Sequence, residues 1–136
     1  VTSYCIAAPN TASATGAKIR MVGLPSISLN TSVLEATDCP AGQYGIFYYG
    51  PWQVQLPFGD GYRCVAGSVF RLMPPMLSSG AGVASRTLDY NASPMGSGAG
   101  QITSGSTWNF QYWYRDPTPV GYGFNLSDGL EVTFCP

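Results

Sequence analysis

The stretch STWNFQYWYRDPTPVGYGFNLSDGLEVTFCP, residues 106–136, decides the fold class of this chain. Trp108 to Arg115 alternates large aromatic with mainly polar residues, and Leu130 to Phe134 repeats the alternation with smaller apolar side chains. This alternation is typical of half-buried β-strands, because successive side chains of a strand point to opposite faces. The connection between the two segments is rich in Gly, Pro, Asn and Asp, which favours a turn or loop. We therefore expect two strands here, each with one buried face.

The rest of the chain is divided into short β-prone runs by turn-forming residues that recur about every ten positions. The runs are Ala17 to Val22, Ser26 to Leu29, Gln43 to Tyr49, Trp52 to Leu56, Tyr62 to Leu72 and Val83 to Tyr90. Gly67 predicts a bulge or bend within the long fifth run. No window has helical periodicity. We expect an all-β fold, a two-sheet antiparallel sandwich of jelly-roll type with about eight strands.

Composition limits the kind of partner. The 136 residues fit one domain, 1–136, and only 10% of them are charged, against about 25% in ordinary soluble domains. The formal net charge is −1, so we expect no nucleic acid partner. No apolar run approaches the roughly 20 residues that span a bilayer, so we expect no membrane insertion. The chain begins at Val1, which we interpret as a processed mature chain or an excised domain.

The four cysteines are Cys5, Cys39, Cys64 and Cys135. They form an even, widely spaced set without a CxxC pair, which favours disulfides over zinc. Four cysteines allow three pairings, and we favour Cys5–Cys135 and Cys39–Cys64. The alternative is four buried thiols in a cytosolic protein. Two disulfides predict a secreted or extracellular, disulfide-stapled domain.

Several motifs resemble a known domain. They are YCIAAPN (4–10), GQYGIFYYG (42–50), PFGDGYRCVAGSVFRL (57–72), GSTWNFQYWYRDP (105–117) and GFNLSDGLEVTFCP (123–136). Together they resemble a β-rich domain common at the C-terminus of large secreted proteins of planctomycetes and some other environmental bacteria. The resemblance implies export from a bacterial cell and a β-rich fold, and it supplies no catalytic residues. Such domains often follow a larger module, so this chain is either cut from a longer protein or a free-standing subunit.

Catalytic chemistry is sparsely supplied. Without histidine, a Ser-His-Asp or Cys-His site is impossible. A hydrolase would need two converging carboxylates, but most acidic residues, such as Asp60 in Gly-Asp-Gly and Asp128 in Ser-Asp-Gly, lie in turn contexts. Calcium ligation by Asp60, Asp116 and Asp128 is the best metal hypothesis, yet no acidic calcium loop is present. We expect no enzyme activity, no metal and no cofactor.

The aromatic residues leave two interpretations open. Trp113 shares one predicted strand face with Asn109, Gln111 and Arg115, a composition found where sugars stack on exposed rings beside amides. Trp52 is a second candidate for contact with a glycan or a protein partner. The alternative is that the rings fill the core or stack against Arg115.

These observations favour a non-enzymatic extracellular structural or adhesive module at the cell surface, with the subunit of a self-assembling filament as one form of it. Low charge permits close packing of copies, and open sheet edges permit strand addition. In that case the terminal segments, Val1 to Asn10 or Leu130 to Pro136, are expected near the contacts, and the partner is another copy or another extracellular protein. The alternative function is a carbohydrate-binding module, and a carboxylate hydrolase is the third hypothesis.

Overall fold

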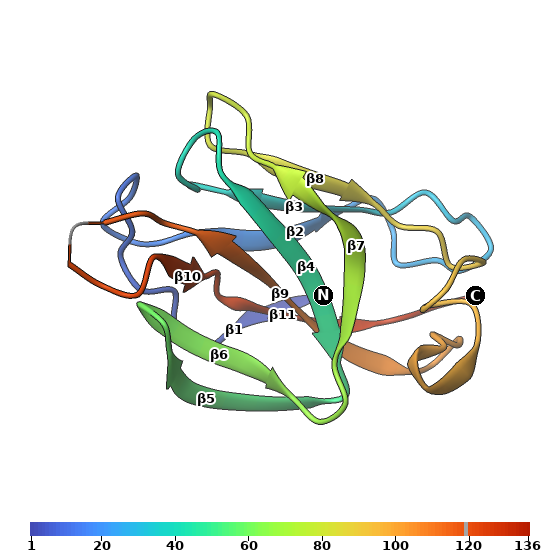
Figure 1. The fold of residues 1–136 in the computed structure, drawn as a ribbon. Coiled ribbons are helices and arrows are strands. Elements are labelled where there is room, and N and C mark those ends of the chain that lie inside the picture. Colours follow the sequence, from blue (N-terminus) through green and yellow to red (C-terminus); the bar gives the residue numbers. More distant parts are fainter. Residues whose placement is uncertain (119) are drawn as a thin grey trace.

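The structure is a computed structural model that describes residues 1–118 and 120–136 (Figure 1). Its strands are β1 (Thr2–Tyr4), β2 (Lys18–Val22), β3 (Val33–Thr37), β4 (Tyr44–Gly50), β5 (Trp52–Phe58), β6 (Gly61–Ala66), β7 (Phe70–Leu77), β8 (Ala84–Thr87), β9 (Thr107–Arg115), β10 (Phe124–Leu126) and β11 (Gly129–Thr133). One 3-10 turn covers Gly98–Gly100. No helix in the described part of the chain is long and apolar enough to cross a membrane. The expected antiparallel all-β sandwich is confirmed, with eleven described strands in place of about eight.

The strands form three layers. The central sheet has the order β1-β11-β9-β4-β7, with the short β10 also paired to β9. The sheet β2-β3-β8 packs on one face of the central sheet, and the β5–β6 hairpin packs on part of the other face (Figure 1). Alternation along β4 and β9 therefore sends successive side chains into two different interfaces.

The main core lies between the central sheet and the β2-β3-β8 sheet. It contains Phe47 and Tyr49 of β4 and Ile19 and Leu34 of the smaller sheet. The predicted buried faces of the C-terminal strands are confirmed: Phe110, Tyr112, Tyr114, Leu130, Val132 and Phe134 are all buried here. Each such large apolar side chain contributes about 1.5–3 kcal/mol relative to exposure.

Some predicted runs differ from the observed strands. Tyr62 to Leu72 is two strands, β6 and β7, which belong to different sheets and are separated by a turn in which Gly67 has φ +84°. A side chain there would be strained, which is why glycine occupies the turn. Residues 27–29 form a turn, while β3, β10 and β1 were not among the predicted runs.

β7 continues through two prolines because it lies at the edge of its sheet. Pro74 and Pro75 suggest a strand break, yet β7 continues to Leu77. β7 pairs with β4 alone and forms the edge of the central sheet. An edge strand tolerates proline, because a backbone N–H that faces solvent needs no partner strand.

The predicted disulfide pairing is wrong. Cys5 pairs with Cys64, whereas Cys39 is buried as a free thiol and Cys135 is exposed as one. Cys39 belongs to the core on one face of the central sheet, and Cys64 lies in the hairpin on the opposite face, so the sheet separates them.

The geometry of β1 and β11 excludes the other predicted pair. Tyr4 is opposite Gly129 at the start of β11, whereas Cys135 follows the end of that strand. At about 3.3 Å per residue, Cys5 and Cys135 lie roughly 20 Å apart along β11. Cys5 instead lies beside β6, where the Tyr4 hydroxyl donates a hydrogen bond to the Cys64 carbonyl at 2.7 Å.

Candidate functional site

The outward face of β9 carries four of the predicted contact residues, and the structure separates them into two pairs. Asn109 and Gln111 are 3% and 0% exposed because the β5–β6 hairpin covers them. Trp113 is half-buried against Phe58 at the end of β5, and Arg115 is exposed. The interpretation of Asn109 and Gln111 as ligand contacts is therefore wrong.

Gln111 is a structural residue whose amide joins three segments. Its side-chain oxygen accepts hydrogen bonds from the Cys64 N–H at 2.9 Å and from the Tyr48 hydroxyl. Its amide nitrogen donates to the carbonyls of Tyr62 at 2.9 Å and Ser127 at 2.7 Å. A buried amide is tolerated when its donors and acceptors are satisfied, and here they hold the hairpin on the sheet.

Asn109 has the same role nearer the start of β9. Its side-chain oxygen accepts a hydrogen bond from the Gln53 side chain at 2.9 Å, and its nitrogen donates to the Gly50 carbonyl at 3.4 Å. Both partners belong to β4 or β5, so Asn109 fixes the beginning of the hairpin.

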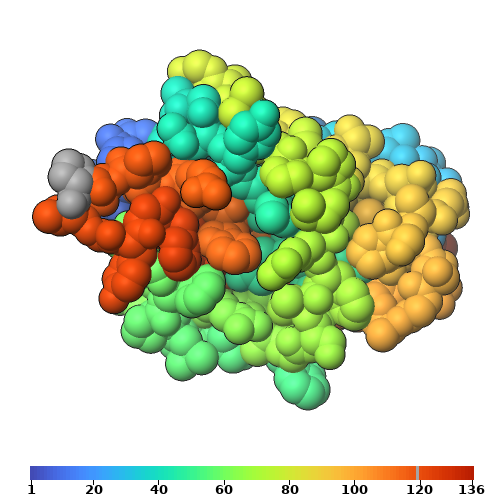
Figure 2. All heavy atoms as spheres, viewed as in Figure 1, coloured from blue at the N-terminus to red at the C-terminus, as the bar shows by residue number. Residues whose placement is uncertain are grey.

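A groove of about 610 Å³ occupies the part of this face that the hairpin leaves open. Its lining residues are Tyr44, Gly45, Ile46, Pro75, Trp113, Tyr114, Arg115, Tyr122, Gly123 and Phe124. We call it the Trp113 groove. Ile46 and Trp113 are directly paired across β4 and β9. In Figure 2 the hollow lies between the orange-red atoms of the β9–β10 segment and the yellow-green atoms of β7.

Aromatic rings dominate the Trp113 groove. The ring of Phe124 meets that of Trp113 edge-on with centroids 5.8 Å apart, and Phe58 packs against both rings. Tyr44 is 55% exposed and Tyr122 is 75% exposed. The groove thus combines a fixed aromatic wall with two solvent-exposed phenol rings, a surface to which the apolar face of a ligand can bind.

The β5–β6 turn positions the Tyr122–Phe124 wall. The Asp60 carboxylate accepts a hydrogen bond from the Tyr122 N–H at 3.0 Å, and the Asp60 N–H donates to the Phe124 carbonyl at 3.0 Å. At Gly59, a Cβ atom would lie 2.3 Å from the Phe124 ring, so glycine allows the turn to pack on this wall. Asp60 is therefore a turn residue that organises the groove.

A smaller recess of about 130 Å³ adjoins Trp113 on the hairpin side. It is lined by Tyr48, Phe58, Arg63, Val69, Arg71, Trp113 and Leu126. The guanidinium carbon of Arg71 lies 5.9 Å from the centroid of the Trp113 ring, a cation–π contact. Trp113 therefore forms a wall shared by the groove and the recess.

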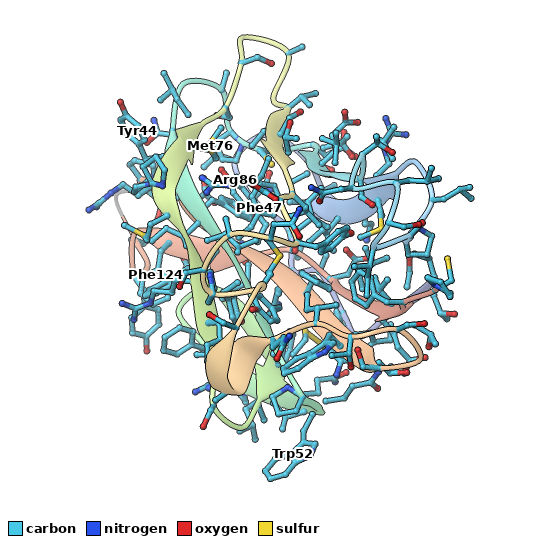
Figure 3. The ribbon with its side chains drawn as sticks, turned by 90° about the vertical axis from the view of Figure 1, so that its right-hand side faces the viewer. Tyr44, Phe47, Trp52, Met76, Arg86 and Phe124 are labelled. Carbon is cyan, nitrogen blue, oxygen red and sulfur yellow. A yellow bond between two sulfur atoms is a disulfide. The ribbon has the colours of Figure 1, made fainter. Side chains whose placement is uncertain are left out.

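Trp52 lies outside this site. It is 67% exposed and begins β5, and it lines neither the groove nor the recess. Figure 3 shows Trp52 projecting from the lower edge of the molecule, whereas Tyr44 and Phe124 both lie toward the left-hand side. The two tryptophans predicted as contacts thus belong to separate surfaces.

The three aspartates of the calcium hypothesis bind different segments of the chain. Asp116 accepts hydrogen bonds from Thr11, Asp128 accepts one from the Ile19 N–H at 2.9 Å, and Asp60 binds Tyr122. Within residues 1–118 and 120–136, no three Cys, Asp or Glu side chains gather as a metal site would require. Burial raises the pKa of Asp128 above its ordinary value, although the Ile19 bond and nearby Lys18 oppose that shift.

Comparison of the chain with known protein families, with curated proteins and with solved structures finds no match. The resemblance to the planctomycete domain therefore stays a prediction, and the site has to be interpreted from its own geometry. Sequence reasoning missed the contribution of Tyr122, Phe124 and Arg71. The signal for the first two was present: two aromatic residues stand in the glycine-rich segment GYGF (121–124), between the two predicted C-terminal strands.

Proposed function

We propose that the protein is a non-enzymatic extracellular adhesive module that binds carbohydrate through the Trp113 groove. The observation that carries this proposal is the gathering of Tyr44, Trp113, Tyr122 and Phe124 around one open groove in a chain without histidine. The C–H faces of a sugar ring are apolar while its rim is polar, so an aromatic wall beside solvent suits it.

Support for the extracellular location comes from the Cys5–Cys64 disulfide, a bond that persists in oxidising compartments. The proposal also includes secretion from a bacterial cell, which the resemblance to the planctomycete domain implies.

Binding of wild-type protein and variants to immobilised polysaccharides by affinity electrophoresis tests the proposal. Tyr122→Ala should weaken binding at least about tenfold with little change in stability, because the ring is mostly exposed. Trp113→Ala should weaken it further but also lose packing against Phe58 and Phe124. Trp52→Ala is the matched control, and equal binding by Tyr122→Ala and wild type would contradict the proposal.

A second candidate is the subunit of a filament, and the position of β1 favours it. β1 forms the edge of the central sheet opposite β7, and Val1, Thr2 and Ser3 are exposed. The disulfide and the Tyr4 hydrogen bond fix this edge beside β6, so another strand can add to it with little loss of conformational freedom.

Analytical ultracentrifugation at high concentration tests assembly. Association of the wild-type chain that disappears on deletion of residues 1–3 supports the filament. A monomer in both cases contradicts it and leaves the binding module unaffected.

A further inference from the structure

The charged side chains that line the Trp113 groove and the adjoining recess are all of one sign. The chain has six cationic side chains and seven anionic ones. Three of the arginines, Arg63, Arg71 and Arg115, line the groove or the recess, and no Asp or Glu of the described residues lines either of them. A cationic patch has therefore been assembled on a protein whose formal net charge is −1.

Within the part of the chain that the structure describes, none of these three arginines forms an ion pair with a carboxylate. Among the described residues one ion pair forms, between Arg20 and Glu35 in the β2-β3-β8 sheet, far from this surface in the layered fold. Asp60 is the acid nearest in sequence to the hairpin arginine, and its carboxylate binds the Tyr122 N–H. Of the three arginines, Arg63 donates from its Nε to the Val65 carbonyl at 2.9 Å, which fixes its side chain.

Resting on the function proposed above, we propose that the Trp113 groove is selective for acidic polysaccharides, whose sugars carry carboxylate or sulfate groups. A sugar ring stacks on the aromatic wall, and its anionic group binds in the recess beside Arg63 and Arg71. Arg115, which lines the groove itself, binds an anionic group on a neighbouring sugar of the same chain. Guanidinium groups suit this role because their planar N–H donors match carboxylate and sulfate oxygens.

Competing ligands fit the surface less well. A neutral glycan can stack on the aromatic wall, but it offers no anionic group to the three arginines that line the site. An anionic lipid surface uses the cations, but a flat membrane cannot bring a ring into the aromatic groove. The combination of a stacking wall and flanking arginines is what a charged sugar chain requires.

Two matched pairs of polymers test the inference by calorimetric titration of the intact chain: polygalacturonate against its methyl ester, and dextran sulfate against dextran. We expect the anionic member of at least one pair to bind at least about tenfold tighter, as a charge-assisted contact predicts. Salt should weaken this binding, since exposed charges are screened.

Variants of the arginines provide a second test. Arg71→Gln and Arg115→Gln should each reduce the preference for the anionic polymer severalfold. Lys18→Gln, which removes the same charge from the β2-β3-β8 sheet, is the control and should leave that preference unchanged.

The outcomes separate the two proposals. Equal affinity within both pairs, with Tyr122→Ala still weakening binding, overturns the acidic selectivity and keeps the carbohydrate-binding function. Binding to neither member of either pair, together with no binding on a broad glycan array, overturns both. Binding to phosphatidylglycerol vesicles as tight as to the polysaccharides assigns the arginines to a lipid surface and overturns the inference.

Discussion

The side-chain oxygen of Gln111 accepts a hydrogen bond from the backbone N–H of Cys64 at 2.9 Å, which joins the centre of the β5–β6 hairpin to the middle of the central sheet. This bond lies in a fully buried position. It decides which part of the outward face of β9 is covered and which part remains open as the Trp113 groove.

Gln111→Leu should therefore destabilise the protein strongly. The change leaves the Cys64 N–H, the Tyr48 hydroxyl and two backbone carbonyls without their partner. We expect a loss of about 3–5 kcal/mol in the free energy of unfolding, measured by urea denaturation. Gln55→Leu, on the exposed strand β5, is the control and should change stability by at most about 0.5 kcal/mol. Equal effects of the two changes would refute the role of Gln111.

The cysteines should differ in reactivity in the native protein. Cys135 is exposed, whereas Cys39 is buried and its pKa is raised to about 12 by burial and then by nearby Asp38. A thiol reagent at pH 8 should label Cys135 in the folded chain, and Cys39 as well after unfolding, with mass spectrometry locating each label. Native labelling of Cys5 or Cys64 would contradict the disulfide assignment.

The disulfide should also contribute to stability. Cys5 and Cys64 are separated by 59 positions, and closing a loop of that length contributes about 4 kcal/mol on the chain-entropy model. Cys5→Ser should lower the free energy of unfolding by an amount of that order, while Cys135→Ser should have little effect. A larger loss from Cys135→Ser would indicate that the C-terminal cysteine is the bonded one.

Asp128 should make stability depend on pH in the direction opposite to an ordinary paired carboxylate. Burial raises its folded pKa, so the folded chain holds the proton more tightly than the unfolded chain. Its contribution is fully present below the unfolded value of about 4 and is lost as the pH rises through the higher folded pKa.

Asp128→Asn isolates this contribution, because the amide oxygen can still accept the bond from the Ile19 N–H. The free energy of unfolding of wild type minus that of the variant should rise as the pH falls from 7 to 4. Urea denaturation at several pH values measures it. A difference that stays constant or falls on acidification would show that Asp128 is not held in a desolvating position.

Local pattern in the sequence was sufficient for most of the longer strands and for the buried faces of the two C-terminal ones. The alternation in β9 and β11 predicted that Tyr112 and Val132 are buried, because that depends on side chains within one strand. The same alternation placed Gln111 with the solvent-facing residues. Its burial depends on the hairpin, whose N–H and carbonyl groups come from residues about 50 positions away along the chain.

The errors in the disulfides and the site have the same origin. The cysteine pairing follows from which side of the central sheet each cysteine occupies, and spacing along the chain carries no information on that. The Trp113 groove combines Tyr44, Pro75, Trp113 and Tyr122 from four separate segments. Sequence composition identified Trp113 as a candidate, but the arginines and tyrosines around it are neighbours only in the folded chain.

The most direct test of the account uses the three tryptophans of this chain as reporters. In a heteronuclear NMR titration of the labelled protein with an oligogalacturonate, the indole N–H signal of Trp113 should shift together with the backbone signals of Ile46 and Tyr122. The indole signals of Trp108, which packs against the main core, and of Trp52, outside the groove, should stay in place. Shifts centred on Trp52 or on β1, with Trp113 unchanged, would contradict the assignment of the binding site to the Trp113 groove.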